Sequence, residues 1–261
     1  MVLPHKKEGQ RCFCDVGDNG DCSACADFHH TAQRRWHGRR NPYGALLQAT
    51  DGNLYGTTEA GGANGVGTVF KITTSGTLTT LYSFCSQSGC MDGYLPYAGL
   101  VQATNGDLYG TTGFGGASCA DTGGCGTIFK ITKSGALTTL HSFCSQNGCP
   151  DGKKPFAGLI QATNGNLYGT TVGGGANGGG TLFKITTSGT VTTLYSFCSQ
   201  SACADGQTPL AVLVQATNGD LYGTTGFGGA NCADTGGCGT IFKITKSGTL
   251  TTLHSFFSQN G

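Results

Sequence analysis

The sequence predicts an all-β fold, a β-propeller-like array of four repeats with about four antiparallel strands in each. Two observations carry this prediction. The 261-residue chain contains 47 Gly without a Gly-X-Y period, which is typical of a turn-dense β protein. Two phrases also recur four times: LYGTT begins at Leu54, Leu108, Leu167 and Leu221, and FKIT begins at Phe70, Phe129, Phe183 and Phe242. Self-similarity at intervals of roughly 50 residues indicates a repeat architecture.

The repeats alternate between a short and a long form. They cover about 42–91, 92–150, 151–204 and 205–261, and successive LYGTT phrases are 54, 59 and 54 residues apart. The difference is an insertion in the second and fourth repeats, whose loops both read CADTGGC. Duplication of a two-repeat unit is the simplest history.

Each repeat is expected to contain four short strands, at 98–104, 107–112, 126–132 and 136–143 in the second repeat. Asn105-Gly106 predicts a type I′ hairpin between the first two, because both central residues of that turn need positive φ. The last strand alternates so that both of its faces carry apolar side chains, and a sheet covered on both faces is typical of a propeller blade. A β-solenoid is the alternative, although its coils are usually shorter and need no hairpin turns.

The motif LYGTT…GG…GT[VIL]FKIT..G.[LV]TTL[YH]SF, which covers residues 42–256, resembles the bacterial GloVer tandem repeat. The resemblance implies a secreted or surface protein with a β-propeller fold, and it brings no catalytic residues. Arrays of this family are usually longer than four repeats. The four repeats therefore form either a small ring or an arc of a larger one.

Residues 1–40 do not match the repeats. They hold all five arginines, the single tryptophan, Cys12, Cys14, Cys22, Cys25 and the pair His29-His30. The cysteine spacing is loosely zinc-like, a disordered tail is a second interpretation, and the pairing of these cysteines stays open. A third is an out-of-frame piece of a preceding repeat or a mis-called start, because FHHTAQRRWHGRR read one base out of register allows the phrase TTLHS…DG. That interpretation also explains why no signal peptide is present in this chain.

Composition excludes some partners. From Asn41 onward the chain has no arginine, so it lacks the basic stripe of a nucleic-acid-binding protein. No apolar run is long enough to span a membrane.

Ten cysteines of the repeats form five local pairs that we predict to be disulfides bracing loops at the sheet rim: Cys85/Cys90, Cys119/Cys125, Cys144/Cys149, Cys198/Cys203 and Cys232/Cys238. Phe257 replaces the cysteine whose partner would follow Gly261, which supports pairing between sequence neighbours. Metal ligation and redox catalysis are disfavoured because the repeats contain no C-x-x-C. Disulfides and a neutral, hydroxyl-rich composition suit an extracellular location.

The candidate binding loop is glycine-rich and occurs twice, with Phe114 and Asp121 in one copy and Phe227 and Asp234 in the other. An aromatic ring beside a carboxylate on a braced loop suits a sugar or a protein ligand. The alternative, that both rings cap the core of their repeat, is favoured.

Other polar residues are interpreted as structural. The Asn-Gly-Asp turns at Asn105 and Asn218 are read as hairpin turns rather than calcium ligands. Asp92, Asp151 and Asp205 each precede a glycine and are expected to form turns, whereas His141 and His254 are expected to be packed side chains.

We therefore expect a non-catalytic, secreted or cell-surface protein that acts in binding or adhesion through its disulfide-braced loops, without cofactor or metal. Its ligand would be a protein or a glycan. One alternative is a self-assembling structural subunit of a surface layer or filament, because terminal repeats leave sheet edges open. The least favoured is a propeller-type polysaccharide-degrading enzyme.

Overall fold

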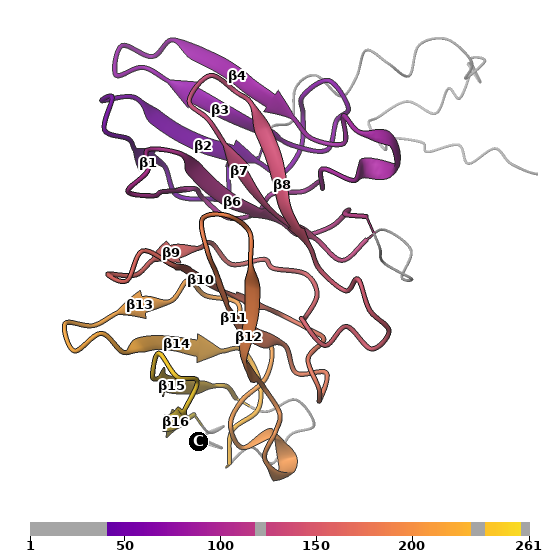
Figure 1. Cartoon of the computed structure of the whole chain (residues 1–261), viewed down its shortest axis with the longest axis vertical. Coiled ribbons are helices and arrows are strands. Elements are labelled where there is room, and N and C mark those ends of the chain that lie inside the picture. The colour runs from indigo at the N-terminus through magenta and orange to yellow at the C-terminus, as the bar shows by residue number, and fades with distance from the viewer. Residues whose placement is uncertain (1–40, 118–123, 231–237, 257–261) are drawn as a thin grey trace, which may run out of the picture. The chain divides into compact units, whose positions relative to one another are not determined.

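A computed structural model describes residues 41–117, 124–230 and 238–256. The predictions for residues 1–40 and for Cys119, Asp121, Cys232, Asp234 and Phe257 lie outside the described residues. Within them, each repeat forms one antiparallel sheet of four strands (Figure 1). The all-β, propeller-like prediction is confirmed.

The strands follow the repeats in order. The first sheet contains β1 (Leu47–Gln48), β2 (Leu54–Thr58), β3 (Thr68–Ile72) and β4 (Leu78–Ser83), and the second contains β5 (Val101–Gln102), β6 (Leu108–Thr112), β7 (Thr127–Ile131) and β8 (Leu137–Ser142). The third contains β9 (Ile160–Gln161), β10 (Leu167–Thr171), β11 (Thr181–Ile185) and β12 (Val191–Ser196), and the fourth contains β13 (Val214–Gln215), β14 (Leu221–Thr225), β15 (Thr240–Ile244) and β16 (Leu250–Ser255). Two short 3₁₀ turns, η2 (Ser88–Cys90) and η3 (Ser201–Cys203), lie in the loops after β4 and β12. Strands pair in chain order within each sheet, and the first is not paired with the last.

The first strand of each sheet is shorter than expected, with two paired residues instead of seven. The segment before β5 contacts the neighbouring repeat instead of pairing within its own sheet. A Cβ atom added at Gly44 would lie 2.3 Å from the Gly99 nitrogen, so the two backbones approach more closely than side chains would allow.

The type I′ prediction for Asn105-Gly106 is wrong. Only Gly106 has positive φ, at 86°. The Gly106 N–H donates to the Ala103 carbonyl at 2.8 Å, and the Ala103 N–H donates to the Asp107 carbonyl at 3.0 Å. This is the three-residue connection in which a left-handed glycine follows the turn. The Asn105 side chain accepts a bond from the Asp107 N–H at 3.1 Å, which holds the turn in this form.

A β-bulge interrupts the last strand pair of every sheet. In the first sheet Val69 pairs with Tyr82 and Phe70 pairs with Thr80, so Leu81 has no residue opposite it. Strict alternation would place Leu81 and Tyr82 on opposite faces. With the bulge, both pack against the same apolar cluster.

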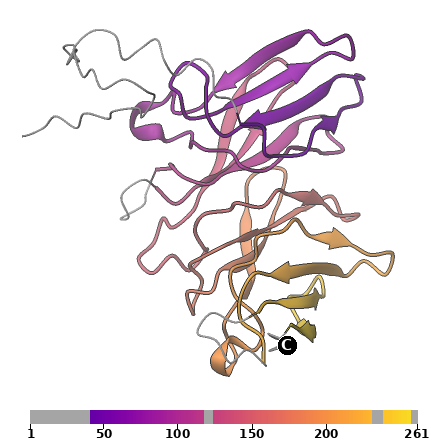
Figure 2. The ribbon, with the colours of Figure 1, turned by 180° about the vertical axis from the view of Figure 1, so that it is seen from behind.

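Apolar clusters join each sheet to the next. Between the first two sheets the cluster combines Tyr55, Val69 and Phe84 with Leu108, Phe129 and Ile131. Equivalent residues form the clusters between the second and third and between the third and fourth sheets. Both views show the sheets following one another in chain order (Figures 1 and 2). The core of this protein therefore lies between its sheets, where burial of each large apolar side chain contributes about 1.5–3 kcal/mol.

Among the described residues, no helix has the length and apolar character needed to cross a membrane.

Candidate binding site

The loop after the last strand of a repeat is organised around a buried aspartate. Asp92 lies in the predicted turn, since the Gly93 N–H donates to the Cys90 carbonyl at 2.9 Å. Its carboxylate is fully buried and accepts bonds from the Tyr82 hydroxyl at 2.8 Å and from the Ser86 and Gln87 N–H groups at 2.9 and 3.2 Å. Asp92 thus ties the loop to strand β4.

The loop after β12 has the same arrangement at Asp205, which accepts bonds from the Tyr195 hydroxyl at 2.8 Å and from the Ser199 N–H at 2.9 Å. Burial raises the pKa of Asp205, but these hydrogen bonds outweigh it and hold the pKa below its usual value of 3.8. Burial, together with the Asp205 carboxylate, raises the pKa of Tyr195 to about 12. The loop therefore holds a charged carboxylate beside a neutral tyrosine across the physiological range.

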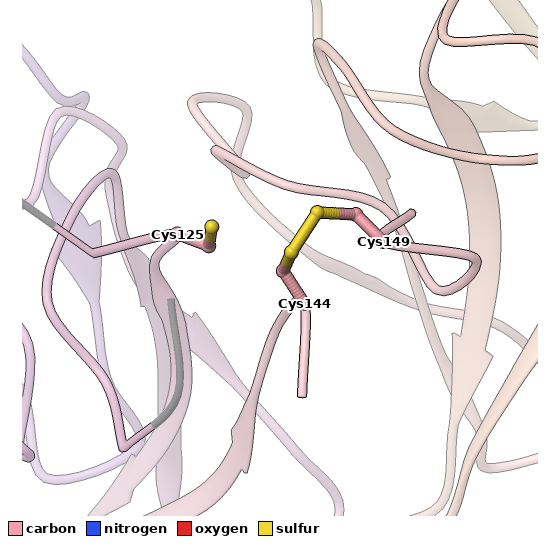
Figure 3. Close-up of side chains that lie close together, drawn as sticks. All are labelled: Cys125, Cys144 and Cys149. Carbon is pink, nitrogen blue, oxygen red and sulfur yellow. A yellow bond between two sulfur atoms is a disulfide. The ribbon is translucent and has the colours of Figure 1, made fainter. Parts of the chain in front are cut away.

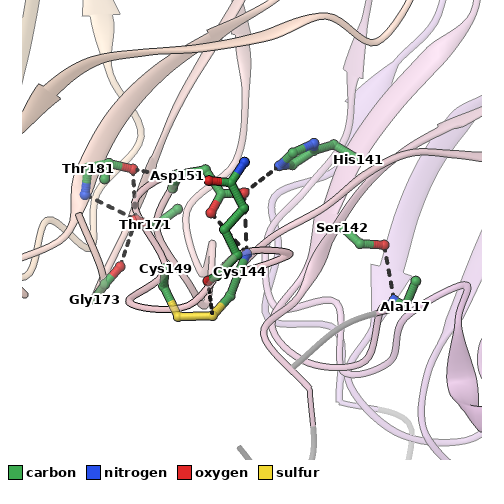
Figure 4. Close-up of polar contacts among 10 residues, drawn as sticks. Ala117, His141, Ser142, Cys144, Cys149, Asp151, Thr171, Gly173 and Thr181 are labelled. Atoms are coloured by element: carbon green, nitrogen blue, oxygen red, sulfur yellow. Dashed lines mark hydrogen bonds and ion pairs between the residues drawn. A yellow bond between two sulfur atoms is a disulfide. The ribbon is translucent and has the colours of Figure 1, made fainter. Parts of the chain in front are cut away.

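His141 takes the tyrosine's place in the second repeat. Its Nε2 lies 2.8 Å from Asp151 Oδ2 (Figure 4). Its ring packs edge-on against Phe143 with centroids 4.9 Å apart. The Cys144 N–H also donates to Asp151, at 3.1 Å. His141 is a packed side chain that additionally bonds the loop carboxylate. His254 is exposed and packs edge-on against Phe256 at 4.9 Å.

The loops around these aspartates are closed by disulfides that join Cys85 to Cys90, Cys144 to Cys149 and Cys198 to Cys203. Cys125 and Cys238 are disulfide-bonded as well. The sulfur of Cys125 lies beside the Cys144–Cys149 disulfide, with all three sulfur atoms within 4.8 Å of one another (Figure 3). Because all three are oxidised, this cluster offers no thiolate to a metal ion.

The structure gathers three aromatic side chains around Phe114, and we call the resulting set of Tyr94, Tyr97, Phe114 and Phe156 the aromatic cluster. Phe114 stacks on Tyr94 with centroids 5.6 Å apart and contacts Phe156 at 5.8 Å. Phe156 meets Tyr97 edge-on at 5.1 Å. Two backbone bonds between Tyr94 and Phe114, of 3.0 and 3.2 Å, fix the first of these contacts. The cluster is half-buried, so it presents aromatic surface to solvent.

Charged groups border the aromatic cluster. The Lys154 ammonium nitrogen lies 5.2 Å from the centroid of the Phe114 ring, within cation–π range. Burial and the neighbouring Glu59 carboxylate raise the pKa of Tyr97, so its hydroxyl remains neutral, donates to Glu59 and can accept a hydrogen bond. The cluster therefore combines apolar faces with a few polar groups, as small-molecule sites do.

A cavity of about 380 Å³ adjoins the cluster. It is lined by residues 43–47, 97–100 and 156–159 together with Leu210 and Val212, and so by the segments that lead into the first strand in all four repeats. Tyr97 and Phe156 belong both to the cavity wall and to the cluster. The cavity and the aromatic cluster therefore form one continuous surface. The volume of the cavity suits a small ligand or one unit of a polymer.

The twin loop differs in its neighbours. Phe227 forms the same backbone bridge as Phe114, but with Gln207 in the place of Tyr94. Its side chain is 44% exposed. The favoured interpretation, that both phenylalanines cap a repeat core, does not describe Phe114, which packs on loop aromatics of its own and the following repeat. The recurrence of Tyr97 and Phe156 after Pro96 and Pro155 was the available signal for this site.

Comparison with known proteins agrees with the repeat pattern. The family model described as the Gloeobacter/Verrucomicrobia repeat matches residues 24–203 and 120–261. No curated protein matches the sequence.

Among solved structures, a protein of unknown function from Dyadobacter fermentans superposes with a TM-score of 0.53 at 11% identity, covering 81% of this chain and 68% of the other. An ulvan lyase of polysaccharide lyase family 25 superposes with a TM-score of 0.50 at 12% identity, covering 84% of this chain. This chain spans 59% of that lyase's length. At such identities the likeness shows the fold alone, a propeller-type one. From the match to its family model, the chain belongs to the Gloeobacter/Verrucomicrobia repeat family.

Proposed function

We propose that this protein is a non-catalytic glycan-binding protein that acts outside the cytosol, and that the aromatic cluster with its adjoining cavity is the binding site. The observation that carries this proposal is the contact of Phe114 with Tyr94 and Phe156 beside a cavity lined by all four repeats. Sugar rings present an apolar C–H face that packs on aromatic rings, while their hydroxyls need a few polar partners. Lys154 and the Tyr97 hydroxyl supply such partners.

Disulfides support the extracytosolic part of the proposal, because they persist in oxidising compartments. The non-catalytic part is supported by the cavity wall, because the described residues that line it include no histidine and no carboxylate.

The test uses a glycan array of neutral and acidic oligosaccharides, followed by titration calorimetry with those that bind. Phe114→Ala is expected to weaken binding about 10-fold or more, the effect of losing a central aromatic contact. Phe227→Ala is the matched control, because it removes the same ring from the twin loop that lacks the aromatic neighbours. It is expected to leave affinity within about 2-fold.

Two outcomes would contradict the proposal. If no oligosaccharide binds, or if both variants lose affinity equally, the aromatic cluster is not the site. Release of shortened products from a bound oligosaccharide, abolished by His141→Ala combined with His254→Ala, would establish an enzyme instead.

A further inference from the structure

The two terminal repeats expose sheet faces that the inner interfaces bury. We call the side of a repeat that contacts the following repeat its leading face, and the side that contacts the preceding repeat its trailing face. On the leading face, Tyr109 is completely buried, whereas its equivalent Tyr222 in the fourth repeat is only half-buried. On the trailing face, Leu100 is buried, whereas its equivalent Leu46 in the first repeat is 54% exposed.

The exposed faces keep the residue types of the buried interfaces. The leading face of the fourth repeat carries Tyr222 and Ile241, the equivalents of Tyr109 and Ile128 in the cluster between the second and third sheets. The trailing face of the first repeat carries Leu54 and Ile72, both half-buried, which are the equivalents of Leu108 and Ile131. One chain therefore holds both halves of an interface that it already forms three times.

A leucine–glycine contact recurs in these interfaces. The bulged leucine of one repeat packs against the turn glycine of the next, so that a Cβ added at Gly135 would lie 2.7 Å from the Leu81 carbonyl oxygen. Gly248 and the Leu194 carbonyl repeat this distance. At the ends of the series, Leu253 is 51% exposed and Gly76 has no atom within 4 Å of such a Cβ.

A hydrogen bond recurs in the same way. The Thr50 N–H donates to the Gln102 side-chain oxygen at 2.9 Å, and Thr104 with Gln161 and Thr163 with Gln215 repeat the bond at 2.9 Å. Each glutamine thus caps the hairpin turn of the preceding repeat. At the ends of the series Gln48 and Thr217 are exposed, and the described part of the chain gives them no such partner.

We propose that the leading face of the fourth repeat binds the trailing face of the first repeat in a second copy of this chain. In this contact Leu253 would meet Gly76 of the second copy, and the Thr217 N–H would meet the Gln48 side chain. The occupant is a second copy of this chain, because its terminal faces match the internal interfaces residue for residue. The match covers the apolar residues, the leucine–glycine contact and the glutamine cap. A contact between two different faces joins copies head to tail, and Leu46 is a residue that the trailing face shares with the cavity of the glycan site.

Sedimentation equilibrium of the full chain over micromolar concentrations tests the contact. We expect reversible association to at least twice the 26.6-kDa chain mass. Leu253→Arg on the leading face and Leu78→Arg on the trailing face, where Leu78 is 50% exposed, should each weaken association at least 10-fold. Met91→Arg is the matched control, because this exposed side chain directly follows the Cys85–Cys90 disulfide loop and lies on neither face.

Mixing the two variants distinguishes head-to-tail contact from other arrangements. The Leu253→Arg chain keeps an intact trailing face and the Leu78→Arg chain keeps an intact leading face, so the mixture should form a one-to-one dimer that stops there. A monomeric wild-type chain would overturn the proposal. So would a mixture that fails to associate, whereas undiminished association of either variant alone would overturn the proposal by showing that like faces pair.

Discussion

Three aspartates anchor the loops of this protein, and of these Asp92 and Asp205 are fully buried while Asp151 is half-buried. Asp92, Asp151 and Asp205 occupy one position in three repeats and each accepts backbone N–H bonds from the loop that follows the last strand. A carboxylate that accepts several such bonds is stabilised in its charged form. Each of these turn-forming aspartates therefore also fixes the conformation of its loop.

Asp205→Asn is predicted to lower the free energy of unfolding by about 2 kcal/mol near neutral pH, because charged hydrogen bonds to a buried acceptor are lost. The depressed pKa of Asp205 contributes stability that is present above the unfolded value and lost as pH falls through the folded value. Urea unfolding at a series of pH values should therefore show a weaker acid dependence in the variant. Asp220→Asn, in an exposed hairpin turn, is the control and should change stability by less than about 0.5 kcal/mol. Equal acid dependence in variant and wild type would contradict the assignment.

The sequence predicts Asp205 as a turn residue but not its role as an anchor. Asp-Gly after a cysteine indicates a turn, and the carboxylate's tyrosine partner lies ten residues earlier, at Tyr195. Phe114 shows the same limit. Its loop stands out in the sequence, yet its neighbours Tyr94 and Phe156 come from loops that only the fold brings together.

At the scale of the elements, two features constrain the disulfide loops: the backbone conformation of their cysteines and the disulfide itself. All six cysteines of the three paired loops have positive φ, for example 63° at Cys198 and 53° at Cys203. Residues other than glycine adopt this region at a cost of about 1–2 kcal/mol. The disulfide offsets this cost by restricting the unfolded chain.

Removing the Cys198–Cys203 disulfide is predicted to have a cost that depends on the replacement. The double variant Cys198→Ser/Cys203→Ser should lose about 2 kcal/mol, the loop-entropy contribution of so short a loop. The double variant Cys198→Gly/Cys203→Gly should be the more stable of the two, because glycine adopts positive φ without penalty. Thermal unfolding of both double variants shows which of the two is the more stable. A serine variant at least as stable as the glycine variant would show that backbone conformation at these sites is unimportant.

The sequence pattern predicted the strands themselves better than the irregularities in their pairing. The LYGTT and FKIT phrases correspond to the second and third strands of each sheet, because alternation and β-branched residues mark them. The bulge at Leu81 was not predicted, since nothing in an alternating pattern indicates an unpaired residue. It nevertheless decides which face Leu81 and Tyr82 share.

For the whole molecule, equivalent residues do not have equivalent environments. The repeat pattern predicts which residues face a neighbouring sheet, but it assigns the same role to Tyr109 and Tyr222. The structure separates them, because Tyr109 packs against the third repeat while Tyr222 lies on the leading face of the fourth. The similarity between repeats thus predicts which residues can form an interface between sheets. It does not predict which repeats lack a neighbour on one side.

Tyr109→Ala and Tyr222→Ala are therefore predicted to differ in cost although they remove the same side chain from the same position. Tyr109 is fully buried, its hydroxyl accepts a bond from the Asn105 amide at 2.9 Å, and truncation should cost about 3–5 kcal/mol. Tyr222→Ala should cost less than half as much when unfolding is measured by urea at concentrations where the chain sediments as a monomer.

Raising the concentration into the range of association should increase the cost of Tyr222→Ala and leave that of Tyr109→Ala unchanged, because only the leading face of the fourth repeat gains a neighbour. Equal costs in the monomer would mean that this face is already covered within one chain. The fourth repeat would then pack against its own first repeat, and copies would have no face through which to join.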